Sequence, residues 1–101
     1  MDKNDMNMLS NMLFAELLIG TILYKSSSEL TISDIKKNPS CETYSEEYIA
    51  QIVNDLISYG IVFPRIKDAA QIVYSITDFG KYYFERLSEE NKDIEAMIVQ
   101  L

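Results

Sequence analysis

Apolar residues between Ser45 and Gly60 recur every three or four positions, a spacing that places them on one side of an α-helix. Thr43 and Glu46 have the spacing of a capping box at the start of this helix, and Ser45 is an alternative N-cap. Gly60 ends it, because glycine enters the left-handed conformation without steric cost. The side that must be buried consists of Ile49, Ile52, Val53, Leu56 and Ile57.

Two short runs rich in β-branched and aromatic residues follow, at 61–66 and 71–76. Such runs predict β-strands, and the short segment 67–70 between them predicts a hairpin. Pro64 has no N–H to donate to a neighbouring strand, so the first strand is expected at a sheet edge or after the proline. Leu30 is expected to add a short third strand.

A shorter helix is predicted upstream, at residues 32–37. Thr31 and Asp34 have capping-box spacing at its start. Pro39 follows its end, where proline is common because it cannot continue a helix. The two helices within residues 31–60 therefore have the order of a helix-turn-helix.

The N-terminal part predicts one long helix at residues 4–25, apolar on nearly all sides. A helix of this kind is usually enclosed on more than one face. Either a second subunit covers the spare side, at Leu9, Leu13 and Leu17, or the C-terminal segment of the same chain does. The apolar run in this helix is shorter than the roughly 20 residues that a membrane span requires, so no membrane contact is expected.

Residues 78–100 show a helical pattern that Thr77 and Asp78 open as a cap, and one long helix or two abutting helices are expected. The first half completes the core. The second half has a short apolar stripe with acidic residues outside it, which indicates a dimer interface, with a frayed amphipathic tail as the alternative. The stripe consists of Ile94, Met97, Ile98 and Leu101.

Two motifs resemble parts of PadR- and MarR-type winged-helix regulators. Residues 56–62 are similar to the passage from the recognition helix to the first wing strand, and residues 74–80 to the second wing strand and the last helix. The resemblance implies an α+β, mostly helical fold: a winged helix-turn-helix with a long N-terminal helix, a two- to three-stranded wing and a C-terminal dimerisation helix. The single domain, 1–101, then comprises an N-terminal helix at 4–25, a helix-turn-helix at 31–60, a wing at 61–76 and a C-terminal helix at 78–100.

Composition limits the chemistry. The chain has 101 residues, 48% of them hydrophobic, which is enough for one domain with a modest core. It has no histidine and a single cysteine, Cys41. A zinc site would lack its usual ligands, and an internal disulfide would lack a second cysteine. We therefore predict no metal, no cofactor and no enzymatic activity. One cysteine and the absence of a signal-peptide pattern fit a cytoplasmic protein.

The net charge of −7 opposes generic DNA binding, because duplex binders gain affinity by replacing counterions with lysine and arginine. Any DNA contact is therefore expected to be local. Gln51 and Asn54 lie opposite the apolar stripe of their helix, and amide side chains can bond adenine in two places through the major groove. The predicted DNA-binding residues are Lys36, Lys37, Tyr44, Ser45, Gln51, Asn54, Arg65, Lys67 and Lys81.

Two functions follow from these patterns. The first is a homodimeric winged-helix protein that recognises repeated sites in double-stranded DNA, as a transcriptional repressor or as a centromere-binding adaptor in plasmid or phage segregation. For the segregation role, the chain resembles TubR-type centromere-binding proteins in length and architecture. That resemblance implies a tubulin-like GTPase as a partner. The alternative function is an acidic winged-helix module that binds a basic protein and not DNA.

Overall fold

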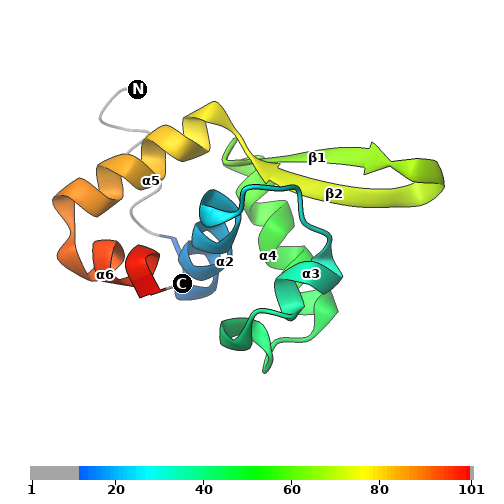
Figure 1. Cartoon of the computed structure of the whole chain (residues 1–101), viewed down its shortest axis with the longest axis horizontal. Helices are drawn as coiled ribbons and strands as arrows, with labels where there is room; N and C mark the ends of the chain where they lie inside the picture. Colours follow the sequence, from blue (N-terminus) through cyan, green and yellow to red (C-terminus); the bar gives the residue numbers. More distant parts are fainter. Residues whose placement is uncertain (1–11, 101) are drawn as a thin grey trace.

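The computed structural model describes residues 12–100, and Figure 1 shows helices gathered around α2 with a long hairpin extending from them. The helices are α2 (Phe14–Lys25), α3 (Ile32–Lys36), α4 (Glu46–Ser58), α5 (Asp78–Glu90) and α6 (Lys92–Gln100). The strands are β1 (Val62–Lys67) and β2 (Gln71–Ile76), and the 3₁₀ turns are η1 (Pro39–Cys41) and η2 (Asp68–Ala70). The expected α+β, mostly helical class is confirmed.

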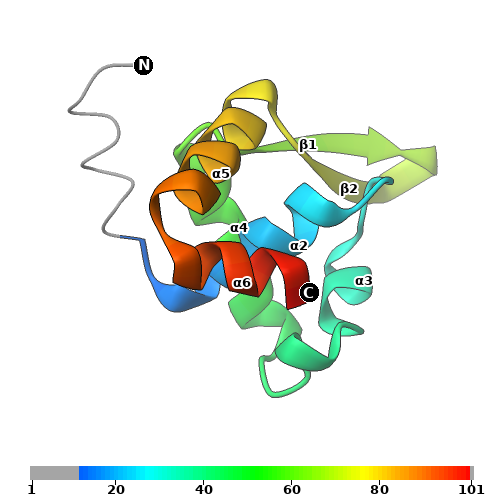
Figure 2. The same cartoon turned by 60° about the vertical axis from the view of Figure 1, so that its left-hand side comes forward.

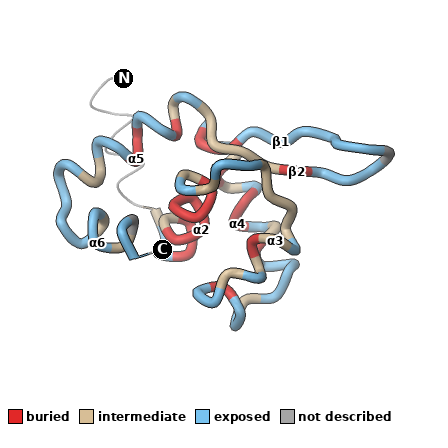
Figure 3. Tube along the Cα trace, in the orientation of Figure 1, coloured by how far each residue is buried: buried red, intermediate tan, exposed pale blue. Residues whose placement is uncertain are grey.

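Helix α2 lies at the centre of the fold, where Figure 3 shows the densest burial. It contacts α4, α5, α6 and β2. At Gly20 a Cβ atom would lie 2.5 Å from the ring of Phe84, so the glycine allows this buried ring to pack directly on the helix. The apolar residues of α2 are therefore covered largely by elements of the same chain, among them α6 of the C-terminal segment.

The expected continuous helix at 4–25 is wrong at its N-terminal side. Helix α2 begins at Phe14, and Leu13 before it has extended backbone angles of φ −65° and ψ 154°. The N–H of Leu13 donates a hydrogen bond of 2.8 Å to Oε1 of Glu16, which fixes the start of the helix. Residues 4–11, including Leu9, lie outside the described residues, and so does Leu101.

The two helices of the helix-turn-helix form, with the predicted capping box at α3 and the alternative cap at α4. Thr31 Oγ1 accepts a hydrogen bond from the N–H of Asp34, and the Asp34 carboxylate accepts one from the N–H of Thr31, both at 3.0 Å. At α4 the expected capping box of Thr43 and Glu46 is wrong, because the helix begins at Glu46 and its cap is the alternative, Ser45, whose Oγ accepts from the N–H of Tyr48 at 3.1 Å. Gly60 follows the helix with φ +79°, the conformation expected of it.

The hairpin pairs β1 with β2 in antiparallel register, with Pro64 opposite Tyr74. Tyr74 exchanges both of its backbone hydrogen bonds with Leu30, at 2.8 and 3.0 Å, so Leu30 adds the expected short third strand. Because the polar backbone groups of Tyr74 point toward Leu30, they do not bond to Pro64. The missing N–H of Pro64 therefore lies on the open edge of β1 and costs the ladder nothing.

The C-terminal segment is two abutting helices, one of the two expected arrangements, and the single helix over 78–100 is wrong. The helical conformation is interrupted at Asn91, which has extended backbone angles of φ −140° and ψ 111°. Its Oδ1 accepts hydrogen bonds from the N–H groups of Asp93 and Ile94, at 2.9 and 3.3 Å, and so caps α6. Figure 2 shows α6 folded back beside α2, and Met97 packs against the core.

Candidate nucleic-acid interface

Helix α4 has one buried and one exposed side. Its buried side consists of residues that are at most 2% exposed, and these anchor it against α2 and α3. Gln51 and Asn54 are both exposed on the other side. The structure therefore presents the two predicted base-reading amides together on the solvent face of the second helix of the helix-turn-helix. The buried residues are Ile49, Ile52, Val53 and Leu56.

The start of α4 carries a tyrosine pair. The rings of Tyr44 and Tyr48 lie with centroids 5.2 Å apart and planes tilted by 57°. Tyr44 is half-buried, whereas Tyr48 is 37% exposed, so it is available to a ligand. The sequence reasoning named Tyr44 but missed Tyr48, which flanks the apolar stripe and could have been found from the predicted cap alone. Ser45 uses its hydroxyl to cap α4.

Acidic residues occupy the first turn of α4. Glu46 and Glu47 are exposed, and carboxylates at this position stabilise a helix through its dipole. The same carboxylates repel phosphates. The exposed face of α4 thus combines two amides suited to base edges with two charges unsuited to a DNA backbone, so any approach to DNA must be specific in its orientation.

The two cations of the hairpin, Arg65 and Lys67, interact with charged residues of the hairpin turn, of α3 and of the segment before it. We call this group the wing cluster. Its members are Glu29, Asp34, Lys37, Arg65, Lys67 and Asp68. Within it, Arg65 Nε donates to Glu29 Oε2 at 2.8 Å and a second Arg65 nitrogen donates to Glu29 Oε1. This hydrogen bond holds the pKa of Glu29 below its usual value, with a smaller contribution from Lys67.

A second part of the wing cluster lies on α3. Lys37 pairs with Asp34 at 3.9 Å. The pKa of Asp34 is lowered chiefly by its hydrogen bonds with Thr31, and Lys37 and Lys67 lower it further. Lys67 thus lies within electrostatic reach of both Glu29, the partner of Arg65, and Asp34, the partner of Lys37.

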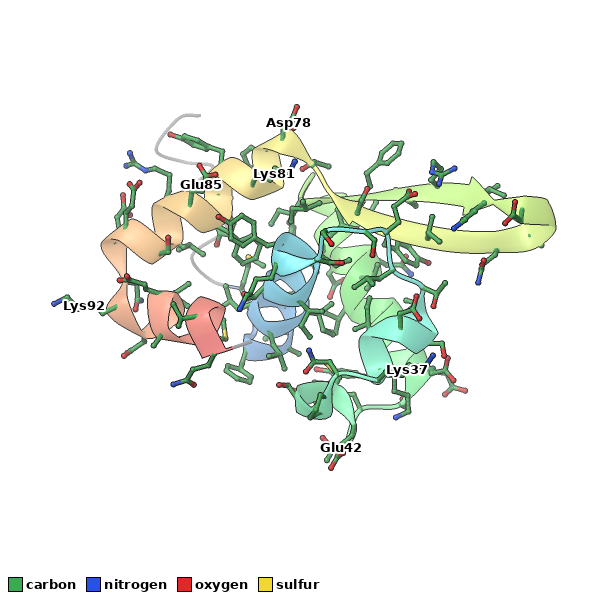
Figure 4. All side chains as sticks on the ribbon, in the orientation of Figure 1. Lys37, Glu42, Asp78, Lys81, Glu85 and Lys92 are labelled. Atoms are coloured by element: carbon green, nitrogen blue, oxygen red, sulfur yellow. The ribbon has the colours of Figure 1, made fainter. Side chains whose placement is uncertain are left out.

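The two remaining predicted lysines are not members of the wing cluster, although Lys81 borders it at Glu29. Lys36 donates hydrogen bonds to the backbone carbonyls of Glu42 and Tyr44, and thereby closes the loop between α3 and α4. Lys81 is exposed on α5 and lines a hollow that Glu29 and Ser75 also line. Figure 4 shows Lys37 and Lys81 well apart.

A buried carboxylate supports the far end of α4. Glu16 is only 2% exposed, and its Oε2 accepts a hydrogen bond of 3.0 Å from the hydroxyl of Tyr59, the residue after α4. Burial, together with this bond, raises the pKa of Tyr59. Burial and the charge of Glu16 also raise the pKa of Tyr83 to about 12. Glu16 therefore joins the first turn of α2 to the end of the candidate recognition helix.

Three of the residues predicted for dimerisation meet at one hollow. Leu17, Ile94 and Met97 line a cavity of about 570 Å³ between α2 and α6, together with Phe14. Beside it, Leu13 is 58% exposed and Phe14 is 66% exposed. Ile98 lies in α6. The structure thus leaves an apolar surface at the α2 and α6 ends, although α6 itself already packs on α2.

Other chemistry is limited within the part of the chain that the structure describes. No group of three or more cysteine, aspartate or glutamate side chains is arranged to hold a metal ion among residues 12–100. Cys41 is fully buried, and burial raises the pKa of its thiol, which disfavours the reactive thiolate. In the same described range, no helix has the length and apolar character to cross a membrane.

The helix-turn-helix, the hairpin after it and the flanking helices define a winged-helix fold. A solved structure confirms this: a possible HxlR family transcriptional factor from Thermoplasma volcanium GSS1 superposes with a TM-score of 0.68 at 21% sequence identity. The similarity covers 96% of this chain and 85% of that one. No family model matches the sequence, and no curated protein matches it.

Proposed function

We propose that this chain is a homodimeric winged-helix protein that recognises repeated sites in double-stranded DNA, as a transcriptional repressor in the cytoplasm. The observation that carries the proposal is the exposed pair Gln51 and Asn54 on α4, the second helix of the helix-turn-helix. The similar solved structure is described as a transcriptional factor, which supports the same class of function.

In this proposal α4 enters the major groove. The N-terminal residues of a recognition helix contact base edges, and Tyr48 joins Gln51 and Asn54 in that role. Gln51 and Asn54 each accept from and donate to an adenine edge. The exposed ring of Tyr48 contacts an apolar group such as a thymine methyl. Ser45 and Tyr44 lie at the phosphate that flanks the first base.

The cations supply backbone contacts in two groups. Lys37, Arg65 and Lys67 of the wing cluster meet one phosphate backbone, whereas Lys36 and Lys81 contribute from outside it. Glu46 and Glu47 offset part of this attraction. We therefore expect binding to depend only modestly on salt. Each phosphate neutralised contributes about 0.9 to the slope of log Kd against log salt.

The first experiment is selection from a random duplex library, followed by titration of the selected duplex at two salt concentrations. We expect an enriched, repeated motif. Gln51→Ala and Asn54→Ala should relax base preference, costing about 1–3 kcal/mol at one position each. Arg65→Ala and Lys67→Ala should weaken binding to every sequence and flatten the salt slope. Unchanged affinity in all four variants would refute the proposed surface.

Dimerisation is assigned to the apolar surface of α2 and α6, formed by Leu13, Leu17, Ile94 and Met97, and the proposal also includes Leu9, Ile98 and Leu101. Exposed Phe14 extends this surface. Light scattering on Phe14→Asp should give the mass of a monomer, since a buried, unpaired charge opposes association. The matched control is Ile66→Asp on the hairpin, where the side chain is 72% exposed and the dimer should persist. Equal masses for both variants would contradict this assignment.

A narrower form of the proposal is the TubR-like role in plasmid or phage segregation. It rests on chain length and architecture, and it requires direct DNA repeats and a tubulin-like GTPase as a partner. A selected motif that recurs in phase with the DNA helix, together with co-sedimentation of the protein–DNA complex with such filaments, would support it over repression.

A second candidate function is an acidic protein-interaction module. The net charge of −7 favours it, as does the pairing of Arg65 with Glu29, which leaves fewer free cations for DNA. No enrichment from the duplex library at low salt would favour this function, and a basic partner should then be sought.

A further inference from the structure

Glu29 and Arg65 form a bidentate ion pair on the hairpin. The Arg65 guanidinium donates two hydrogen bonds, one to each carboxylate oxygen of Glu29, and the Nε bond is 2.8 Å long. A guanidinium binds a phosphate with the same planar fork of donors that it offers a carboxylate. The group best suited to grip a DNA backbone in the wing cluster is therefore occupied by an acid of its own chain.

The strand pairing brings these two residues together. Leu30 and Pro64 both lie opposite Tyr74, one on each side of β2. Residues directly opposite one another share a sheet face, and their neighbours along the chain point to the other face. Glu29 and Arg65 consequently share the face opposite that of Tyr74. A one-residue slip in either pairing would separate them.

The members of the wing cluster carry equal numbers of positive and negative charges. Lys67 and Lys37 are the other cations of the wing cluster, and Asp34 and Asp68 are its other acids. Lys67 lowers the pKa of Glu29, and Asp68 contributes to the raised pKa of Arg65, so these charges lie within electrostatic reach of the pair. Within the wing cluster three cations thus meet three acids, and Lys81 lies at its border, in the hollow that Glu29 also lines. Removing the charge of Glu29 leaves the cluster with a net charge of +1.

We propose that Glu29 competes with a DNA phosphate for the guanidinium of Arg65. This inference rests on the proposed DNA-binding function. The side chains of Arg65 and Glu29 are 48% and 33% exposed, so a phosphate can replace the carboxylate without unfolding the hairpin. Non-specific binding is almost wholly electrostatic, and a neutral cluster suppresses it. When α4 binds its specific DNA site, a phosphate reaches the wing and replaces Glu29 on Arg65.

The test compares Glu29→Gln with Glu89→Gln. Both variants change the net charge by the same amount, but Glu89 is exposed on α5, outside the wing cluster. Binding to a random-sequence duplex is titrated at two salt concentrations. We expect Glu29→Gln to bind about three- to fivefold more tightly than Glu89→Gln, the range of an exposed ion pair. Its salt slope should be steeper by about 0.9, equivalent to one more phosphate neutralised.

A double variant assigns the effect to the ion pair. In an Arg65→Ala background, Glu29→Gln should increase duplex affinity no more than Glu89→Gln does, because Glu29 then has no guanidinium to pair with. Arg65→Lys keeps the charge but loses the fork, and the gain should shrink there too. Urea melts of each variant verify that the chain is folded. If Glu29→Gln loses stability, Glu29→Ser at the same position repeats the comparison.

The outcomes separate this inference from the proposed function. If the wild-type chain binds duplex and Arg65→Ala weakens it, but Glu29→Gln equals Glu89→Gln, the inference fails and DNA binding stands. If Glu29→Gln binds more weakly than the control, the inference also fails, because Glu29 then holds Arg65 in place for DNA. If neither the wild-type chain nor Glu29→Gln binds any duplex at low salt, both proposals fail.

Discussion

Replacing Tyr59 by phenylalanine removes one hydroxyl and tests the link between α2 and the end of α4. In the folded chain this hydroxyl donates to Glu16 Oε2 at 3.0 Å, and Glu16 is 2% exposed. Hydrogen bonds to a charged group contribute about 1.5–3 kcal/mol. Tyr59 is itself only half-buried, so water replaces part of the lost bond and the lower half of that range applies.

We therefore expect Tyr59→Phe to lower the free energy of unfolding by about 1.5–2 kcal/mol. For a chain of this size, about 4–5 °C of melting temperature corresponds to each kcal/mol, which gives a decrease of about 6–10 °C. Urea unfolding followed by circular dichroism measures the first quantity, and thermal melting measures the second. The matched control is Tyr82→Phe, the same chemical change at a side chain that is 46% exposed.

A double-mutant cycle separates the bond from the rest of the tyrosine. In a Glu16→Gln background, Tyr59→Phe should cost about 1 kcal/mol less than it does in the wild-type chain. If Tyr59→Phe unfolds at the same urea concentration as Tyr82→Phe, or if the cycle shows no coupling, the buried carboxylate does not support the end of α4.

Three further predictions concern stability. Gly80→Ala should destabilise the fold by about 1–3 kcal/mol in urea, since its Cβ would lie 2.5 Å from the Ile61 carbonyl oxygen, a backbone atom that cannot rotate away; a wild-type melt would contradict this. Tyr83→Phe should flatten the loss of stability between pH 10 and about 12. The unfolded tyrosine, with a pKa near 10, loses its proton first, so stability falls by up to roughly 2–3 kcal/mol as the pH rises toward the folded pKa of about 12. Lys36→Met should cost about 1 kcal/mol through the two carbonyls it leaves without a donor, whereas Lys37→Met, at a side chain 77% exposed, should cost almost nothing; equal melts would refute the loop-closing role of Lys36.

The helix-turn-helix and the hairpin were predictable because their signals are local. The reciprocal cap of Thr31 and Asp34, the left-handed Gly60 and the β-branched runs each specify a few neighbouring residues, and the structure contains all of them. Pro64 also indicated which strand has the open edge, because a residue without an N–H is tolerated in a sheet mainly at an edge strand.

The errors and omissions come from contacts between distant residues. The start of α2 at Phe14 depends on Glu16, whose second oxygen binds a tyrosine 43 positions away. The turn at Asn91 places α6 against α2, whereas the helical period alone allows a continuous helix. Glu29 carried no signal as part of the candidate site, since its partner is 36 positions away and depends on the pairing of three strands.

The proline on the outer edge of β1 also affects how copies of this chain behave when they are crowded. Repeated DNA sites would hold many wings close together, and an exposed strand edge is a template for sheet growth between molecules. Pro64 removes a donor from that edge, next to the exposed Ile66. If the chain binds repeated sites as proposed, Pro64 should therefore oppose strand pairing between the wings of neighbouring copies.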